Sequence, residues 1–85
     1  MNSLAAKSLR FDDNSMWVDL SDGRTIGVPL AWFPRQLHAS AEQRAKFVIS
    51  GGGSGLHWDE IDEDISVEGL LRGIGDLRAR PEVAA

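Results

Sequence analysis

One histidine and the acids that follow it are the residues whose types and spacing could support acid–base chemistry. His57 and Asp59 stand two positions apart and would share one face of a strand, with Ser54 and Glu60 close in sequence. An imidazole beside a carboxylate can act as a general base. This spacing contains no recognisable nucleophile–base pair, so we assign no catalytic residues. A small hydrolase or lyase using His57 with Asp59 or Glu60 is the third of three functional hypotheses.

The chain lacks the patterns of metal and cofactor sites. It has no Cys, and two histidines without Cys do not form a metal-ligand pattern. A calcium loop laid from Glu60 would put Ile65 at the glycine position and Leu71 at the closing acid. The glycine run over residues 51–55 lacks the terminal Gly-Lys-Ser/Thr of a phosphate loop, and His57 follows it instead of a helix start. We therefore predict no cofactor and no metal, and a bulged or flexible strand connection over residues 51–55.

Aromatic, arginine and acidic side chains are the remaining candidates, and they suit binding to another protein. Trp and Arg dominate the energetics of protein interfaces, and exposed acids attract a basic partner. The acidic run over residues 59–64 is either solvated or an acidic recognition edge. The candidate interaction residues are Arg10, Trp17, Trp32, Arg35, His57, Trp58, Asp59, Asp62 and Asp64.

Composition indicates one ordinary globular domain that must position these residues. Hydrophobic residues make up 42% of the 85 and charged residues 26%, which is normal usage for a globular fold. Chains of this length usually form a single domain. We predict that this domain covers residues 8–73 and that residues 74–85 form a loose C-terminal tail.

The charge balance and the absence of a targeting segment indicate the setting of the protein. Thirteen acidic and nine basic residues give a net charge of −4. Binding of the chain alone to nucleic acid is not expected, because phosphate contacts leave a basic footprint. No apolar run approaches the ~20 residues of a membrane span, and the N-terminus lacks the apolar core of a signal peptide. We therefore expect a cytoplasmic protein without membrane contacts.

Apolar residues that alternate with polar ones predict a three-strand antiparallel meander over residues 9–28. A two-residue loop at Asp22-Gly23 would turn Ile26 onto the polar face, because a one-residue slip reverses every side chain. A three-residue loop with Gly23 in the left-handed conformation keeps Ile26 on the apolar face. We therefore predict a type I turn followed by a glycine bulge. The predicted cross-strand pairs are Leu9–Val18, Phe11–Met16, Val18–Ile26 and Met16–Val28.

The same register places Arg10, Trp17 and Gly27 side by side on the opposite face of the meander. A Trp lying across a strand glycine, next to an Arg, forms a compact amphipathic patch. Either a helix covers this patch or solvent does. An open edge of the sheet also favours a homodimer, unless charged residues guard the edge.

The rest of the chain predicts two further strand segments and two or three short helices. Pro34 suits the first turn of a helix carrying residues 35–38, and Ser40 with Gln43 forms a capping box for a helix over residues 41–46. Residues 47–50 and 56–58 read as strands that extend the sheet. Ser66 caps a last helix that Gly73 ends. The predicted fold class is α+β, an antiparallel sheet that starts with the meander and packs with these helices.

Two strings of this sequence resemble the bacterial family catalogued as domain of unknown function 2442. They are DGRTIGVPLAWFPRQLHASAEQR over residues 22–44 and GGGSGLHWDEIDEDISVEGLL over residues 51–71, and the likeness runs from Leu9 to Gly73. The resemblance implies a small α+β protein of bacteria and phages, often encoded beside another small protein in a toxin–antitoxin-like pair. Some relatives append a helix-turn-helix domain. The family supplies no catalytic or ligand residues to carry over.

The first hypothesis is accordingly a non-enzymatic interaction protein, an antitoxin-like or adaptor partner of another small protein. Trp17 and Arg10 would anchor that partner, and the acids from Asp59 to Asp64 would steer it. The second hypothesis is a DNA-linked transcriptional regulator that uses Arg72, Arg78 and Arg80.

Overall fold

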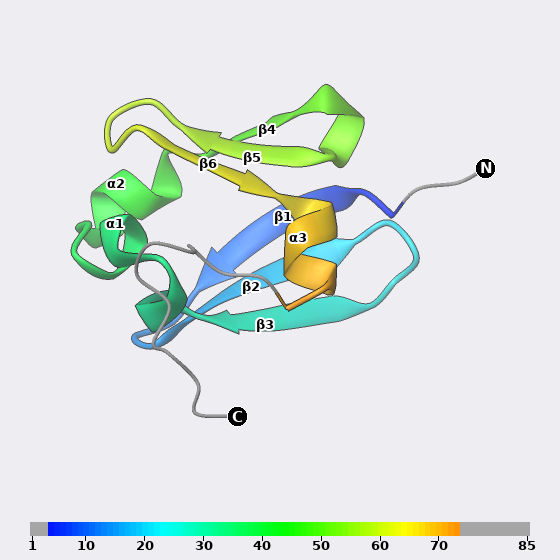
Figure 1. The fold of residues 1–85 in the computed structure, drawn as a ribbon, viewed down its shortest axis with the longest axis horizontal. Coiled ribbons are helices and arrows are strands. Elements are labelled where there is room, and N and C mark those ends of the chain that lie inside the picture. The colour runs from blue at the N-terminus through cyan, green and yellow to red at the C-terminus, as the bar shows by residue number, and fades with distance from the viewer. Residues whose placement is uncertain (1–3, 74–85) are drawn as a thin grey trace.

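Two three-stranded antiparallel sheets and three short α-helices make up the computed structural model, which describes residues 4–73 (Figure 1). The architecture confirms the predicted α+β class. The predicted tail over residues 74–85 lies outside the described residues. In chain order the elements are β1 (Ala6–Phe11), β2 (Ser15–Leu20), β3 (Thr25–Pro29), the 3-10 turn η1 (Leu30–Trp32), α1 (Pro34–Leu37), α2 (Ala41–Ala45), β4 (Val48–Ser50), the 3-10 turn η2 (Gly51–Gly53), β5 (Gly55–Trp58), β6 (Glu63–Ser66) and α3 (Val67–Leu71).

The first sheet, β1–β2–β3, has the predicted register at every pair specified from the sequence, and a register shift occurs between Ala6 and Ser8 at the start of β1. Leu9 pairs with Val18 and Phe11 with Met16, and Val18 pairs in turn with Ile26. Gly23 has a φ of 94° and its amide donates to the carbonyl of Leu20, so the three-residue turn with a left-handed glycine is confirmed. Because side chains alternate along each strand, the apolar face of this sheet points toward the core and the opposite face points outward.

The later strands correct the expectation of one extended sheet. β4, β5 and β6 form a sheet of their own, and β6 occupies the end of the acidic run that we expected to be solvated. Glu63 is only 4% exposed and Ile65 is buried beside it, whereas Asp64 between them is exposed. The run of acids hid this strand in the sequence, because an inward-facing Glu breaks the apolar alternation that marks a half-buried strand.

The inner faces of both sheets contribute to one hydrophobic core. Figure 1 shows α1 and α2 near one end of the two sheets and α3 beside β3. The buried apolar residues are Ala6, Leu9, Met16, Val18, Leu20, Val28, Leu30, Phe33, Leu56, Trp58, Ile65, Val67 and Leu70. Because both sheets contribute their inner residues to this one core, their outer faces are left for polar side chains.

The short helices begin at the predicted caps, and α1 and α2 each end one residue before the predicted end. Pro34 occupies the first turn of α1. Both hydrogen bonds of the capping box between Ser40 and Gln43 are present at the start of α2. The hydroxyl of Ser66 accepts from the Gly69 amide at the start of α3. Gly73, with a φ of 77°, follows the end of that helix.

The glycine-rich connection between β4 and β5 has a defined conformation. Gly51, Gly52 and Gly53 all have positive φ angles, which residues with a Cβ rarely adopt. Gly53 is buried, and a Cβ built on it would lie 2.5 Å from the Cβ of Ala5 and 3.0 Å from the backbone nitrogen of Ala6. Because Gly53 has no side chain, the β4–β5 connection of the second sheet can contact β1 of the first sheet.

This packing predicts different costs for alanine at two neighbouring glycines. A Cβ on Gly52 meets nothing within 4 Å, so Gly52→Ala pays only for its left-handed backbone, about 1–2 kcal/mol. Gly53→Ala should cost about 1–3 kcal/mol more, because its Cβ also overpacks the seam between the sheets. Urea unfolding of both variants measures the difference, and equal losses would contradict the close approach.

Gln36 of α1 is a buried polar side chain, and it predicts a stabilising substitution. It is 0% exposed, and neither its amide nitrogen nor its amide oxygen has a hydrogen-bond partner. Burying such a group unpaired costs about 1–3 kcal/mol, so Gln36→Met should raise the free energy of unfolding. The control is Gln43→Met, which removes the side-chain half of the capping box and the hydrogen bond to Glu60 and should lower it. Both are read from urea unfolding, and a destabilised Gln36→Met would contradict the absence of a partner.

Candidate functional site

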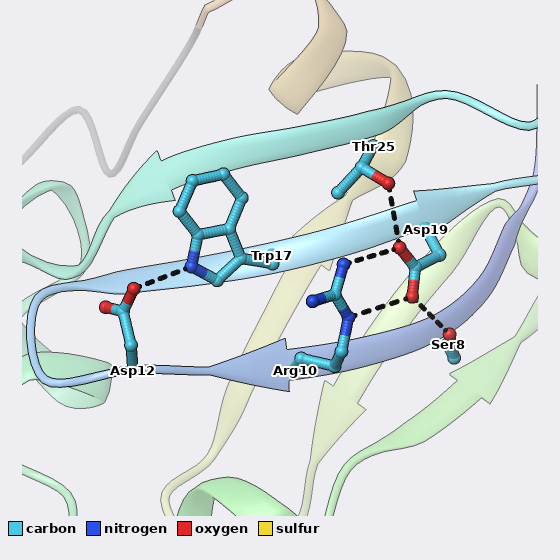
Figure 2. Close-up of polar contacts among 6 residues, drawn as sticks. All are labelled: Ser8, Arg10, Asp12, Trp17, Asp19 and Thr25. Atoms are coloured by element: carbon cyan, nitrogen blue, oxygen red, sulfur yellow. Dashed lines mark hydrogen bonds and ion pairs between the residues drawn. The ribbon is translucent and has the colours of Figure 1, made fainter.

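The outer face of the first sheet carries an aromatic ring that is fixed at its edge and on one side. The Trp17 ring lies across β3 at Gly27, where a Cβ would be only 2.4 Å from the ring atom Cζ3. Its Nε1 donates to Oδ2 of Asp12 at 2.8 Å (Figure 2). Trp17 is half-buried, so part of the ring remains available at the surface.

Asp12 holds both the β1–β2 turn and the indole of Trp17. Its Oδ1 accepts from the backbone amides of Asn14 at 2.9 Å and Ser15 at 2.8 Å. The hydrogen bond from Trp17, followed by those two amides, lowers the pKa of the Asp12 carboxyl below its ordinary value. The ring and the turn are thus fixed by one ionised carboxylate.

Asp19 is the centre of a second polar network on the same face. Arg10 donates to it twice, from Nη2 to Oδ1 at 2.9 Å and from Nε to Oδ2 at 3.2 Å. Ser8 donates at 2.7 Å and Thr25 at 2.8 Å (Figure 2). The hydrogen bonds from Arg10, Ser8 and Thr25 hold the pKa of the Asp19 carboxyl well below its usual range. We call the six residues of Figure 2, namely Ser8, Arg10, Asp12, Trp17, Asp19 and Thr25, the Trp17 face.

His57 lies on the outer face of the second sheet between two carboxylates. Its Nδ1 is 2.6 Å from Oδ1 of Asp64, its cross-strand neighbour on β6. Its Nε2 is 2.5 Å from Oδ1 of Asp59, just beyond the end of β5. Hydrogen bonds to Asp64 and then Asp59 raise the pKa of His57 above 6.5. We call these three residues the His57 cluster.

The loop over residues 59–62 contacts the two helices that precede β4. Arg35 of α1 donates from Nη1 to the carbonyl of Asp62 at 3.0 Å and lies 3.7 Å from Oε1 of Glu63. Glu60 accepts from Gln43 at 3.0 Å and from Lys46 at 3.2 Å. These bonds lower the pKa of Glu60, with Gln43 as the larger cause.

The sequence-predicted candidates thus divide among three places. Arg10 and Trp17 belong to the Trp17 face. The residues His57, Asp59, Asp62, Asp64 and Arg35 gather around the β5–β6 loop. Trp32 is half-buried against the core.

Trp58 corrects the expectation of a surface aromatic. It is 1% exposed, and its Nε1 donates to the carbonyl of Arg44 at 3.0 Å. Trp58 faces inward because its neighbour His57 faces outward on the same strand. Its hydrogen bond attaches the core to the end of α2, which is a structural role.

Two carboxylates of the Trp17 face, those of Asp12 and Asp19, were missing from the sequence candidates. Asp19 stands two positions from Trp17 on one strand and therefore shares its face, so strand parity could have identified it. Asp12 lies in the turn between β1 and β2. Its contact with the Trp17 indole, five positions away, depends on the conformation of the β1–β2 turn. The alternation of side chains along a strand does not predict that conformation.

The described residues offer little for metal or general-base chemistry. No group of three His, Cys, Asp or Glu side chains within residues 4–73 could hold a metal ion. When the His57 ring is charged, both of its nitrogens donate to carboxylates, so neither can accept a proton from a substrate. The described part of the chain also contains no helix that is long and apolar enough to cross a membrane.

The comparisons with known proteins place this chain in a family. The model of the family described as "Protein of unknown function (DUF2442)" matches residues 6–76. The chain belongs to this family. No curated protein matches the chain.

Two solved structures share its fold. A crystal structure of a protein of unknown function from Rhodospirillum rubrum is 34% identical with a TM-score of 0.81, over 95% of this chain and 100% of that one. A solution structure of an uncharacterised protein from Chromobacterium violaceum has a TM-score of 0.72 at 23% identity, over 85% of this chain and 68% of that one. The second likeness shows the fold alone. Neither structure carries a described function that bears on the Trp17 face or the His57 cluster.

The network around Asp19 predicts a specific pH dependence. Folding lowers the pKa of Asp19 from 3.8, so its contribution to stability is present above pH 3.8 and is lost as the pH falls through the folded value. Asp19→Asn should destabilise the protein at pH 7, and the difference from wild type should shrink below pH 3.8. Urea unfolding at several pH values measures this. Asp13→Asn, in the exposed neighbouring turn, is the control, and a difference that grows in acid would contradict the network.

Proposed function

We propose that this protein is a non-enzymatic interaction module that binds another small protein through the Trp17 face, as an antitoxin-like or adaptor partner. The observation that carries the proposal is the partly exposed Trp17, whose ring β3 supports from beneath and Asp12 holds at its edge. The proposed setting is the cytoplasm, where a chain without Cys needs no disulfide.

Rigid anchors favour binding because they lose little conformational freedom when a partner arrives. The side chain of Arg10 is 61% exposed, yet two hydrogen bonds to Asp19 fix its guanidinium. Trp17 is fixed in the same way by Asp12. Trp and Arg are the residues that most often dominate interface energies. Together they form a preorganised pair of anchors on two adjacent strands.

The acids near β6 complement these anchors by attracting a basic partner. The side chains of Asp59 and Asp64 are 91% and 79% exposed, and the chain carries a net charge of −4. These acids lie on the outer face of the second sheet and not beside the Trp17 face, so they would act on a partner through the long-range field of the chain, which affects mainly the rate of encounter. The acids are therefore proposed to steer a partner that the Trp17 face then holds.

The two other hypotheses have no observation that favours them. DNA binding relies on Arg72, Arg78 and Arg80, and the last two lie outside the described residues. Catalysis by His57 requires a ring nitrogen that can accept a proton, whereas in the charged His57 cluster both nitrogens donate to carboxylates. Neither is proposed here.

The proposal predicts that loss of Trp17 weakens partner binding far more than truncation of an exposed apolar residue elsewhere. Tagged wild type captures partners from nuclease-treated lysate of the source organism, and the captured protein is then purified and titrated calorimetrically. Trp17→Ala should weaken binding by at least about tenfold, which is about 1.4 kcal/mol. Val48→Ala, which truncates a side chain 51% exposed on the other sheet, should leave affinity within about twofold.

A second variant separates binding from folding. Trp17→Phe keeps a ring over Gly27 but removes the indole nitrogen and part of the ring area, so it should fold and still bind more weakly than wild type. Urea unfolding is measured on every variant. Unchanged affinity in both Trp17 variants, or losses of binding that only match losses of stability, would contradict the proposal.

A further inference from the structure

His57 makes two contacts that require two protons on one ring. Its Nδ1 and Nε2 each lie within hydrogen-bond distance of a carboxylate oxygen, from Asp64 and Asp59 respectively. An ionised carboxylate only accepts, so each ring nitrogen must donate. Only the imidazolium form carries both N–H groups. The geometry therefore belongs to charged His57.

A neutral ring would keep one of these contacts and lose the other. The remaining nitrogen would turn a lone pair toward a carboxylate oxygen, which is repulsive. Asp64 is fixed opposite His57 by the β5–β6 pairing, whereas Asp59 has left the strand and its side chain is 91% exposed. Asp59 is accordingly the contact that breaks.

Asp59 begins the loop over residues 59–62, which joins β5 to β6. On the helix side this loop is held by the bond from Arg35 to the Asp62 carbonyl and by the bonds of Glu60 with Gln43 and Lys46. On the sheet side, the side chain of Asp59 attaches the loop to β5 through His57. Protonation of His57 thus decides whether the loop is held from both sides or mainly from the helices.

The charges that face the ring from the surrounding elements act in the same direction. β6 supplies Asp64, the loop supplies Asp59, and Glu60 is compensated by Lys46 at 3.2 Å. β4 places the uncharged Val48 directly opposite His57. Within residues 4–73, the groups that contact the ring directly are thus two anions that favour its charged form.

We propose that His57 is a pH-sensitive clamp that holds the β5–β6 loop against the second sheet when the ring is charged and releases Asp59 when the ring is neutral. Loss of the ring proton removes one positive charge from the outer face of this sheet and leaves Asp59 unpaired. The clamp does not depend on the Trp17 face. It would operate whether or not that face binds a partner.

Nuclear magnetic resonance on the labelled full chain tests the clamp. The ring signals of His57 give its titration midpoint, which should lie above 6.5, and the backbone amide signals of residues 59–62 should shift with the same midpoint. Asp59→Asn should lower the His57 midpoint and remove the coupled shift of the loop. Asp64→Asn should lower the midpoint further, because Asp64 is the larger cause of the raised pKa.

Two histidine variants complete the experiment. His57→Gln should abolish the pH-dependent shift of the loop signals near neutrality, since a glutamine does not titrate. His38→Gln, which removes the other histidine of the chain at the end of α1, should leave that shift in place. Loop signals that do not move through the His57 titration, or that move equally in His57→Gln, would overturn the clamp.

Discussion

The structure depends on strand alternation around one shared core. Two small sheets contribute their inner residues to a single hydrophobic cluster, and a chain of this size has no second interior to bury the other faces. Each sheet therefore keeps one polar face in contact with solvent. At Gly53, the β4–β5 connection contacts the start of β1 without an intervening side chain. This close contact brings the two sheets near enough for their short strands to share one core.

Carboxylates organise both outer faces, and they do so in different ways. On the first sheet, Asp19 accepts from three side chains and Asp12 accepts from an indole and two amides. On the second sheet, one imidazole donates to two aspartates. In the first case the acid is the hub and its donors stay protonated at neutral pH. In the second case the base is the hub, and its second proton is the one that a rise in pH removes.

Much of the fold could be predicted from the sequence because its signals are local. Gly23 sets a three-residue turn between β2 and β3, and the register that follows places Trp17 opposite Gly27. The β1–β2 register places Trp17 opposite Arg10. Burial that depends on residues far away in the sequence could not be predicted in this way. Glu63 reads as a solvated acid, yet it faces the core on a strand, because its burial depends on what packs against β6. The same limit applies to Trp58, whose partner is a carbonyl at the end of a separate helix.

The candidate site was predictable only in part, since a side chain's role depends on what holds it. Residue type identified Trp17 and Arg10 as anchors, but their rigidity comes from Asp12 and Asp19, which carry no motif. Residue type also identified His57 as a base, whereas its two carboxylate neighbours make it a donor at both nitrogens. A charged imidazole that donates at both nitrogens cannot also accept a substrate proton. The same geometry makes the protonation of His57 matter for the conformation of the loop.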